Sequence, residues 1–292
     1  MDLPLVVGVD GSESSLAAVD WAVDEAARLG LPLRLVQASL WERYEAATDL
    51  VDYVARPSER AMAERILASA AERARRRRGG VKVSTEVLPE DAPTALLREA
   101  RNASTLVVGH RGRGPVAELL LGSVSLALAA RARCPVVVVR GSSPPGDLAR
   151  GPVLLGVGEP ASGSAAVRFA FRAAAARRCG LDAVRAWRCP AHETVDHPHL
   201  AEDPARAHLS RASALLDEAL GDAVREFPEV EVRRLVVEGP ARKILLDLSA
   251  DAGLLVVGAR RRHGHFGLQL GRVGHAALHH AACPVAVVPQ HG

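Results

Sequence analysis

The chain has 292 residues, and because this is about twice the length of a typical domain, two domains are the starting expectation. Hydrophobic residues make up 48% and charged residues 24%, a composition typical of globular rather than disordered or fibrous proteins. A net charge of only +3, an aromatic content of 3% and apolar runs too short to cross a bilayer argue against nucleic-acid and membrane partners.

Short β-rich runs alternate with longer helical patterns along the first half of the chain. The first residues, MDLPLVVGVDGS, contain neither the basic start nor the cleavage site of a secretory signal, so we expect a cytoplasmic protein. They run directly into the first of five predicted strands, which cover residues 5–9, 33–38, 81–88, 105–109 and 135–140.

Apolar residues at helical spacing lie between these strands. The first predicted helix has Ser12 or Ser14 as its N-cap and Gly30 as its stop, with apolar residues at 16, 19, 23 and 26. The second has apolar residues at 62, 66, 67, 70 and 74 and ends in the basic run 75–78, which we interpret as a solvated helix end. A third helix follows Pro93, and a fourth begins near Gly122.

The resulting βαβαβαβαβ order predicts an α/β fold. Continuously apolar strands such as residues 136–139 indicate a parallel sheet that helices cover on both faces. Right-handed crossovers with one reversal of winding make such a sheet doubly wound, that is, Rossmann-like. Its ligands bind at the carboxyl ends of the strands beside the reversal, which makes the loops after the first and fourth strands the candidate site.

The second half of the chain repeats the first. Residues 107–139 align without gaps with residues 256–288, and 16 of these 33 positions are identical. A glycine- and proline-rich segment, GSSPPG at 141–146, separates the two copies. We therefore expect two tandem five-stranded parallel-sheet domains, at residues 1–141 and 152–292, joined by a linker at 142–151.

Glycine, serine and charged residues gather in the loops at the predicted switch point. The first strand ends in Asp10-Gly11-Ser12, the fourth ends in Gly109-His110-Arg111-Gly112, and Gly122-Ser123-Val124-Ser125 opens the fourth helix. Glycines let backbone amides approach an anion closely, and a helix N-terminus offers unpaired N–H groups. These features suit a polyphosphate, although each loop alone is also a common structural turn.

The spacing G-xx-G-x9-G-S from Gly109 to Ser123, with an aspartate after the first strand and the strand CPVVVV afterwards, resembles the ATP-binding type of the universal stress protein family. The resemblance covers nearly the whole chain as two copies. It implies an adenine nucleotide alpha hydrolase-like fold in each copy and a dimer that binds ATP, with Mg²⁺ on the phosphates. It also implies a stress or dormancy regulator with at most slow ATP hydrolysis.

The resemblance also implies roles for individual residues of the first copy. Asp10 would contact the adenosine portion, and the backbone of Ala38 would meet adenine. The ribose and phosphates would be surrounded by residues of the two later loops, namely Gly109, Arg111, Gly112, Gly122, Ser123, Val124 and Ser125.

The second copy departs from this pattern at the site itself. Gly158 stands in place of Asp10, while Gly112, Ser123 and Ser125 are replaced by Arg261, Arg272 and Gly274. Gly258 and Gly271 remain as candidate binding residues, and the added arginines can still attract phosphate by their charge. The second copy is therefore either a weakened nucleotide site or a degenerate domain retained for pairing.

Other nucleotide and catalytic motifs fit less well. The segment GRGPVA at 112–117 matches GxGxxA of dinucleotide folds, but Pro115 delays the helix and no acidic residue ends the following strand. DGSESS at 10–15 lacks the SGGxDS order of ATP pyrophosphatases, and GK[ST] is absent. No catalytic residue is expected, because Ser123 and Ser125 have no evident His or Asp partner. We favour binding over turnover, with a slow metal-dependent ATPase and a nucleotide-free dimerisation scaffold as the alternatives.

Cysteines and histidines predict no metal site. Cys134, Cys179, Cys189 and Cys283 have no CxxC spacing, so free thiols are expected. His275 and His279 stand four residues apart on a predicted helix, but HExxH is absent, and we favour a helix-surface or interface role for them.

The fifth strand of each copy is predicted to lie at a sheet edge, where it is a template for pairing. The resemblance implies that the two copies pair through these strands within the chain, and that the chain forms a homodimer.

Overall fold

The computed structural model describes residues 3–40, 59–112, 121–140, 151–158, 164–189, 204–260 and 270–290. The chain divides into two compact units, Met1–Gly141 and Ser142–Gly292. Apart from Gly151, the linker expected at 142–151 lies outside the described residues. That each unit is an independently folding domain stays a prediction.

The first unit is a parallel sheet with the strand order β3-β2-β1-β4-β5. Its strands are β1 (Leu5–Gly8), β2 (Leu33–Ala38), β3 (Val83–Leu88), β4 (Thr105–Gly109) and β5 (Val136–Val139). Leu5 of β1 lies opposite Leu33 on one side and Thr105 on the other. The winding therefore reverses between β1 and β4, and the predicted α/β doubly wound sheet is confirmed.

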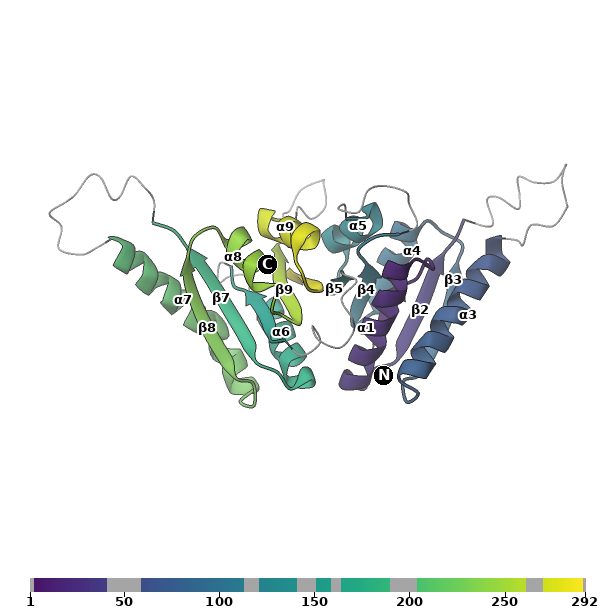
Figure 1. The fold of residues 1–292 in the computed structure, drawn as a ribbon, viewed down its shortest axis with the longest axis horizontal. Coiled ribbons are helices and arrows are strands. Elements are labelled where there is room, and N and C mark those ends of the chain that lie inside the picture. Colours follow the sequence, from purple (N-terminus) through teal and green to yellow (C-terminus); the bar gives the residue numbers. More distant parts are fainter. Residues whose placement is uncertain are drawn as a thin grey trace. The chain divides into compact units, whose positions relative to one another are not determined.

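Helices cover both faces of this sheet (Figure 1). They are α1 (Glu13–Leu29), α3 (Glu59–Arg77), α4 (Ala92–Glu99) and α5 (Ser123–Arg131), with a short 3₁₀ turn at Ala100–Asn102. Helices α1 and α3 pack against each other on one face, and α4 and α5 pack against each other on the other face. Strand β5 is buried along its whole length, because helices cover it on both sides.

The second unit repeats the architecture with the strand order β10-β9-β6-β7-β8. Its strands are β6 (Val153–Gly156), β7 (Leu181–Trp187), β8 (Val232–Glu238), β9 (Leu254–Arg260) and β10 (Val285–Gln290). Its helices are α6 (Ser164–Arg177), α7 (Pro204–Glu226), α8 (Ala241–Leu248) and α9 (Arg272–His280). The buried alanines 18, 22 and 26 of α1 recur as the buried alanines 166, 170 and 174 of α6. The duplication therefore extends to the packing register.

Local sequence accounts for both ends of α1. Ser12 is the N-cap of α1, since its Oγ accepts a hydrogen bond from the backbone N–H of Ser15, and Gly30 ends the helix with φ 66°.

The apolar face expected for α3 was placed wrongly at one position. Met62 is 43% exposed, whereas its neighbour Ala63 is buried, because the buried stripe continues through Leu67 in steps of four residues.

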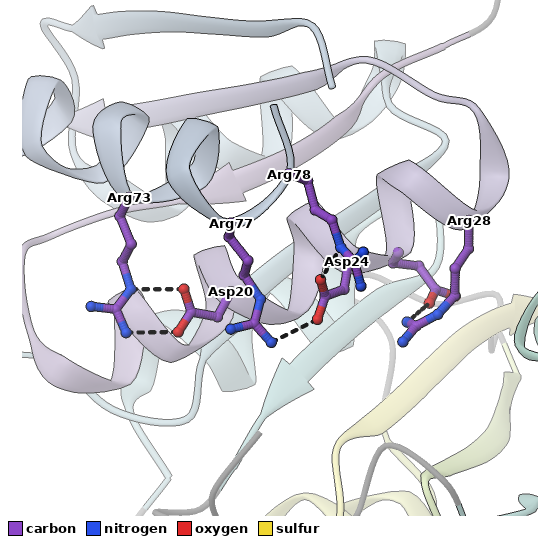
Figure 2. A network of polar contacts seen from close by, with 7 residues as sticks. Asp20, Asp24, Arg28, Arg73, Arg77 and Arg78 are labelled. Carbon is purple, nitrogen blue, oxygen red and sulfur yellow. Dashed lines mark hydrogen bonds and ion pairs between the residues drawn. The ribbon is translucent and has the colours of Figure 1, made fainter. Parts of the chain in front are cut away.

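Helices α1 and α3 are joined by ion pairs along one seam, shown in Figure 2. The guanidinium of Arg73 donates to both carboxylate oxygens of Asp20, at 2.7 and 2.6 Å. Arg77 and Arg78 each donate to Asp24 at 2.7 Å. Burial alone would raise the pKa of Asp24, but these two guanidinium groups outweigh it and the pKa lies below its usual value. The end of the basic run is thus engaged with α1, although the Arg78 side chain is still 51% exposed, as a solvated helix end would be.

The corresponding helices of the second unit carry the opposite charges. When corresponding helices are aligned by their buried residues, Asp20 and Asp24 of α1 correspond to Arg168 and Arg172 of α6. In the same way, Arg73 and Arg77 of α3 correspond to Asp222 and Glu226 of α7. All four residues of the second unit are exposed. Phe171 and Phe227, with ring centroids 5.9 Å apart, form an apolar contact between α6 and the end of α7.

Candidate functional site

The carboxyl ends of β1 and β4 border a cavity of about 440 Å³ in the first unit. Its lining includes all nine predicted residues of this unit: Asp10, Ala38, Gly109, Arg111, Gly112, Gly122, Ser123, Val124 and Ser125. The volume lies within the range of small-molecule sites. The structure thus brings together residues from four segments of the chain, which lie at positions 10, 38, 109–112 and 122–125.

The loop after β1 places a carboxylate at the mouth of the cavity. Asp10 Oδ1 accepts hydrogen bonds from the backbone N–H of Ser12 at 2.9 Å and from its hydroxyl at 2.6 Å. Gly11, between them, has φ 80°, a conformation that favours glycine. A Cβ on Gly112 would lie 2.7 Å from Asp10 Oδ2. Glycine at 112 therefore keeps room for the Asp10 carboxylate.

Gly109 is required for a reason that the sequence did not reveal. A Cβ at this position would lie 2.2 Å from Ser14 Oγ and 2.6 Å from the Ser14 backbone. Close approach of an anion was the expected reason for this glycine, yet the structure shows the first turn of α1 against it. Gly109 thus lets helix α1 begin directly beside the end of β4.

Helix α5 points its N-terminus at the cavity. Its N-cap is Gly122, which provides no side-chain hydrogen bond to the first turn. The N–H groups of Ser123 and Val124 at this end are among those that a helix leaves without intrahelical partners, and they attract anions. Ser125 is buried and donates its hydroxyl proton to the Gly109 carbonyl oxygen at 2.7 Å. This bond ties α5 to β4 and leaves Ser123 as the more accessible hydroxyl.

One part of the cavity wall is apolar. Val36 of β2, Val108 of β4, and Ala92 and Leu96 of α4 line it. A flat aromatic ring fits such a surface, while the charged groups Asp10 and Arg111 lie at the other loops. The sequence had not indicated these apolar residues, although the spacing of Ala92 and Leu96 places both on one helix face.

Ser14 and His110 were also missed as participants in the site. Ser14 Oγ lies 3.2 Å from His110 Nδ1 and accepts the backbone N–H of Arg111 at 3.2 Å. Burial lowers the pKa of His110, and the guanidinium groups of Arg140 and Arg111 lower it further. The neutral form of His110 is therefore favoured. Its adjacency to Arg111 in the loop was the available signal.

The second unit has a larger cavity, about 850 Å³, at the corresponding strand ends. Gly258 and Gly271 line it, together with Arg272 and Gly274, whereas Arg261 lies outside the described residues. A Cβ on Gly258 would lie 3.0 Å from Gln290 Nε2, so that side chain occupies the space beside the glycine. The cavity persists, but a guanidinium group stands where the first unit has Ser123.

The histidine, cysteine and carboxylate side chains of the described residues do not form an evident metal or redox site. No group of three or more His, Cys, Asp or Glu side chains there could hold a metal ion. His275 and His279 stack with ring centroids 4.4 Å apart. The four cysteines are thiols and not members of disulfides, and burial raises the pKa of Cys134 to about 11 and that of Cys283 to about 12.

A Mg²⁺ ion with a nucleotide fits this donor set only through the phosphates. Mg²⁺ keeps several water ligands and commonly binds substrate phosphates with one or two carboxylates. Asp10 is the one carboxylate among the described lining residues of the first cavity.

Within the described residues, no helix is both long enough and apolar enough to span a membrane.

Comparison with known proteins agrees with this architecture. The model of the universal stress protein family matches residues 3–140 and again residues 150–289. A universal stress protein of Mycobacterium tuberculosis is 34% identical over 306 residues, covering 98% of this chain and 97% of its own. One from Mycolicibacterium smegmatis is 32% identical over 292 residues, covering 97% and 96%.

A solved structure that matches nearly the whole chain shows the same fold. The crystal structure of a universal stress protein from Archaeoglobus fulgidus covers 98% of both chains with a TM-score of 0.68 at 16% identity. A universal stress protein solved in complex with cAMP covers 47% of this chain and 96% of its own, with 30% identity and a TM-score of 0.36. The two family matches and the full-length relatives show that this chain belongs to the universal stress protein family.

Proposed function

We propose that the first unit is a receptor for adenine nucleotides, with ATP as its ligand. The observation that carries this proposal is a single cavity whose lining combines apolar residues with the N-terminus of α5. The apolar wall suits a purine ring, and the helix N-terminus suits phosphates. Mg²⁺ would be held by the bound phosphates and water.

Asp10 and Arg111 would divide the recognition between them. The Asp10 carboxylate is held by the Ser12 N–H and hydroxyl, and it is an acceptor suited to the ribose hydroxyls. Arg111 carries a guanidinium at the cavity, which is suited to phosphate oxygens. Ala38 at the end of β2 places backbone groups beside the apolar wall, where they would meet the edge of adenine.

The output of the site would be nucleotide-dependent binding of a partner in a stress or dormancy response. Slow hydrolysis is the less favoured function, because Asp10 is the single carboxylate among the described lining residues and has no second acid or base beside it there. A general base needs hydrogen-bond access to the attacking water. Cytoplasmic location and homodimer formation stay predictions.

Titration calorimetry with ATP and Mg²⁺ tests the proposal with Ser123→Ala. We expect the Kd of the variant to rise about tenfold to a hundredfold, the effect of one lost charge-assisted hydrogen bond. Ser69→Ala is the matched control, because Ser69 is an exposed serine of α3, on the other face of the sheet.

Three results would contradict the proposal. ATP that does not bind the unmodified protein, or that binds Ser123→Ala equally well, would exclude this cavity as the site. Phosphate release that Ser123→Ala abolishes would show that turnover, and not binding alone, is the function. Gly109→Ala does not serve as a test of binding, because its methyl group would overlap the first turn of α1.

A further inference from the structure

The apolar surface of the first cavity recurs residue for residue in the second unit. Val184 corresponds to Val36, because each carbonyl oxygen accepts the N–H of the residue that follows the first strand of its unit, at 2.9 and 2.8 Å. In the first cavity this surface and the end of β2 consist of Val36, Ala38, Ala92, Leu96 and Val108. In the second cavity the same residue types line the corresponding positions, namely Val184, Ala186, Ala241, Leu245 and Val257. The surface suited to a purine ring is therefore retained.

The charge beside this surface is reversed. The first cavity has the carboxylate of Asp10 after β1, whereas the second has Gly158 at the corresponding position. Arg185 of β7 lines the second cavity and is half-buried. Its Nη1 donates to the carbonyl oxygen of Gly158 and, at 3.4 Å, to that of Val157. A guanidinium group thus lies directly beside the residue that replaces Asp10.

A second guanidinium group lines the cavity at the start of α9. Arg272 is the first residue of this helix and corresponds to Ser123 in the first unit. A helix N-terminus already carries partial positive charge, so an arginine there is unfavourable unless an anion lies nearby. The first turn of α9 contains no acidic residue, and none of the described residues that line the second cavity is acidic. The cavity therefore attracts negative charge at two places.

Replacing a carboxylate by an arginine has a defined effect at a ribose site. In dinucleotide-binding folds an acidic residue accepts hydrogen bonds from the ribose hydroxyls, whereas an arginine accommodates a phosphate attached to the ribose. A carboxylate repels such a phosphate, while a guanidinium group binds its oxygens in pairs. The second cavity is also larger, about 850 Å³ against about 440 Å³, and so has room for an additional phosphate.

We propose that the second unit is a receptor for nucleotides that carry a phosphate on the ribose, at the 2′ or 3′ position, as well as at the 5′ position. Arg185 would bind the ribose phosphate, and Arg272 with the N-terminus of α9 would bind the 5′-phosphate. The inference rests on the proposed function, because it assigns the purine ring to the apolar surface in both units.

Titration calorimetry of the full chain tests the proposal, with ATP present at a concentration that saturates the tight site. Adenosine 3′,5′-bisphosphate and adenosine 2′,5′-bisphosphate are compared with ADP, which has the same number of phosphates but carries both at the 5′ position. We expect at least one bisphosphate to bind about tenfold to a hundredfold more tightly than ADP, the effect of charge-assisted hydrogen bonds to one phosphate. This comparison uses the unmodified protein and does not depend on the folding of a variant.

Two variants assign the ribose phosphate to one arginine. Arg185→Gln introduces the residue that the first unit has at the corresponding position, Gln37, so the side chain suits the strand. It should abolish the preference for the bisphosphate over ADP. Arg272→Ala should weaken both ligands about equally and keep the preference. Arg172→Gln is the matched control, because Arg172 is an exposed arginine of α6 outside the described lining, and it should change neither affinity.

The possible failures are distinguishable. ATP that does not bind in the absence of bisphosphate would overturn the proposed function of the first unit. Bisphosphates that bind no more tightly than ADP, or a preference that persists in Arg185→Gln, would overturn the proposal for the second unit alone. Inorganic pyrophosphate that binds as tightly as the bisphosphate would also overturn it, because the site would then recognise phosphate without the purine. Bisphosphate binding that saturating ATP abolishes would place the ligand in the ATP site and overturn it as well.

Discussion

Gly109 shows how a residue expected for one purpose can be required for another. The glycine pattern indicated an anion site, and the structure places this glycine in the cavity lining. Its missing side chain nevertheless makes room for Ser14 rather than for a ligand. Local sequence can show that a glycine is needed, but the atom that occupies the vacated space comes from a residue 95 positions away.

Two glycines of the site should therefore differ in their effect on stability. Gly109→Ala should lower the free energy of unfolding by about 1–3 kcal/mol, the usual penalty for overpacking. At Gly122 a Cβ would meet its nearest neighbour at 3.4 Å and the φ is −64°, so Gly122→Ala should lower it by under about 1 kcal/mol. Urea unfolding measures both, and an equal loss in the two variants would contradict this reading of Gly109.

The same distinction explains what the sequence could predict of the site. All nine residues expected in the first unit line one cavity, because the order of strands and helices brings the loops that carry them to one edge of the sheet; that they bind a nucleotide stays a prediction. Ser14 and His110 were missed because their contact joins two loops through side chains. Neither hydrophobic periodicity nor motif spacing predicts which side chains of two separate loops will be in contact.

At the scale of elements, the seam between α1 and α3 was the feature that the sequence described least well. Apolar periodicity predicted both helices, and the basic run was interpreted as a solvated end. The partners of Arg77 and Arg78 lie on a helix about 50 positions earlier. Periodicity predicts a buried face but gives no information on which charges will meet across it.

The Asp20–Arg73 pair should contribute measurable coupling. In a double-mutant cycle with Asp20→Ala and Arg73→Ala, we expect a coupling free energy of about 1 kcal/mol, the upper end for exposed pairs. The reason is the bidentate geometry and the burial of Asp20, 8% exposed, set against an Arg73 side chain that is 47% exposed. The pair Arg60 and Glu64, exposed at both ends, is the control and should give about 0.3–0.5 kcal/mol. Equal values would refute the distinction.

At the scale of the whole molecule, the duplication predicts that the two units have the same fold. The residues of the two sites predict that the units differ in nucleotide binding. Both units have a cavity at corresponding strand ends. The second has Gly158 in place of Asp10 and Arg272 in place of Ser123. The fold could be inferred from the repeat, whereas occupancy depends on these few substitutions.

We therefore expect one tight ATP site per chain. Calorimetry should give a stoichiometry near one, and Ser123→Ala should remove that tight phase. Arg272→Ala in the second unit is the matched control and should leave it unchanged. A stoichiometry of two with equal affinities would show that the substitutions in the second unit are tolerated.

The opposite charges on the two helix seams have a consequence for how the chain assembles. Because the buried alanine registers agree, α7 could in principle pack on α1, and α3 on α6, as in a domain-swapped arrangement. Such an exchange would place Asp222 and Glu226 opposite Asp20 and Asp24, and arginines of α3 opposite arginines of α6. Like charges facing each other are repulsive, most of all beside a buried carboxylate. The reversed charges would therefore disfavour such an exchange of helices between the two units.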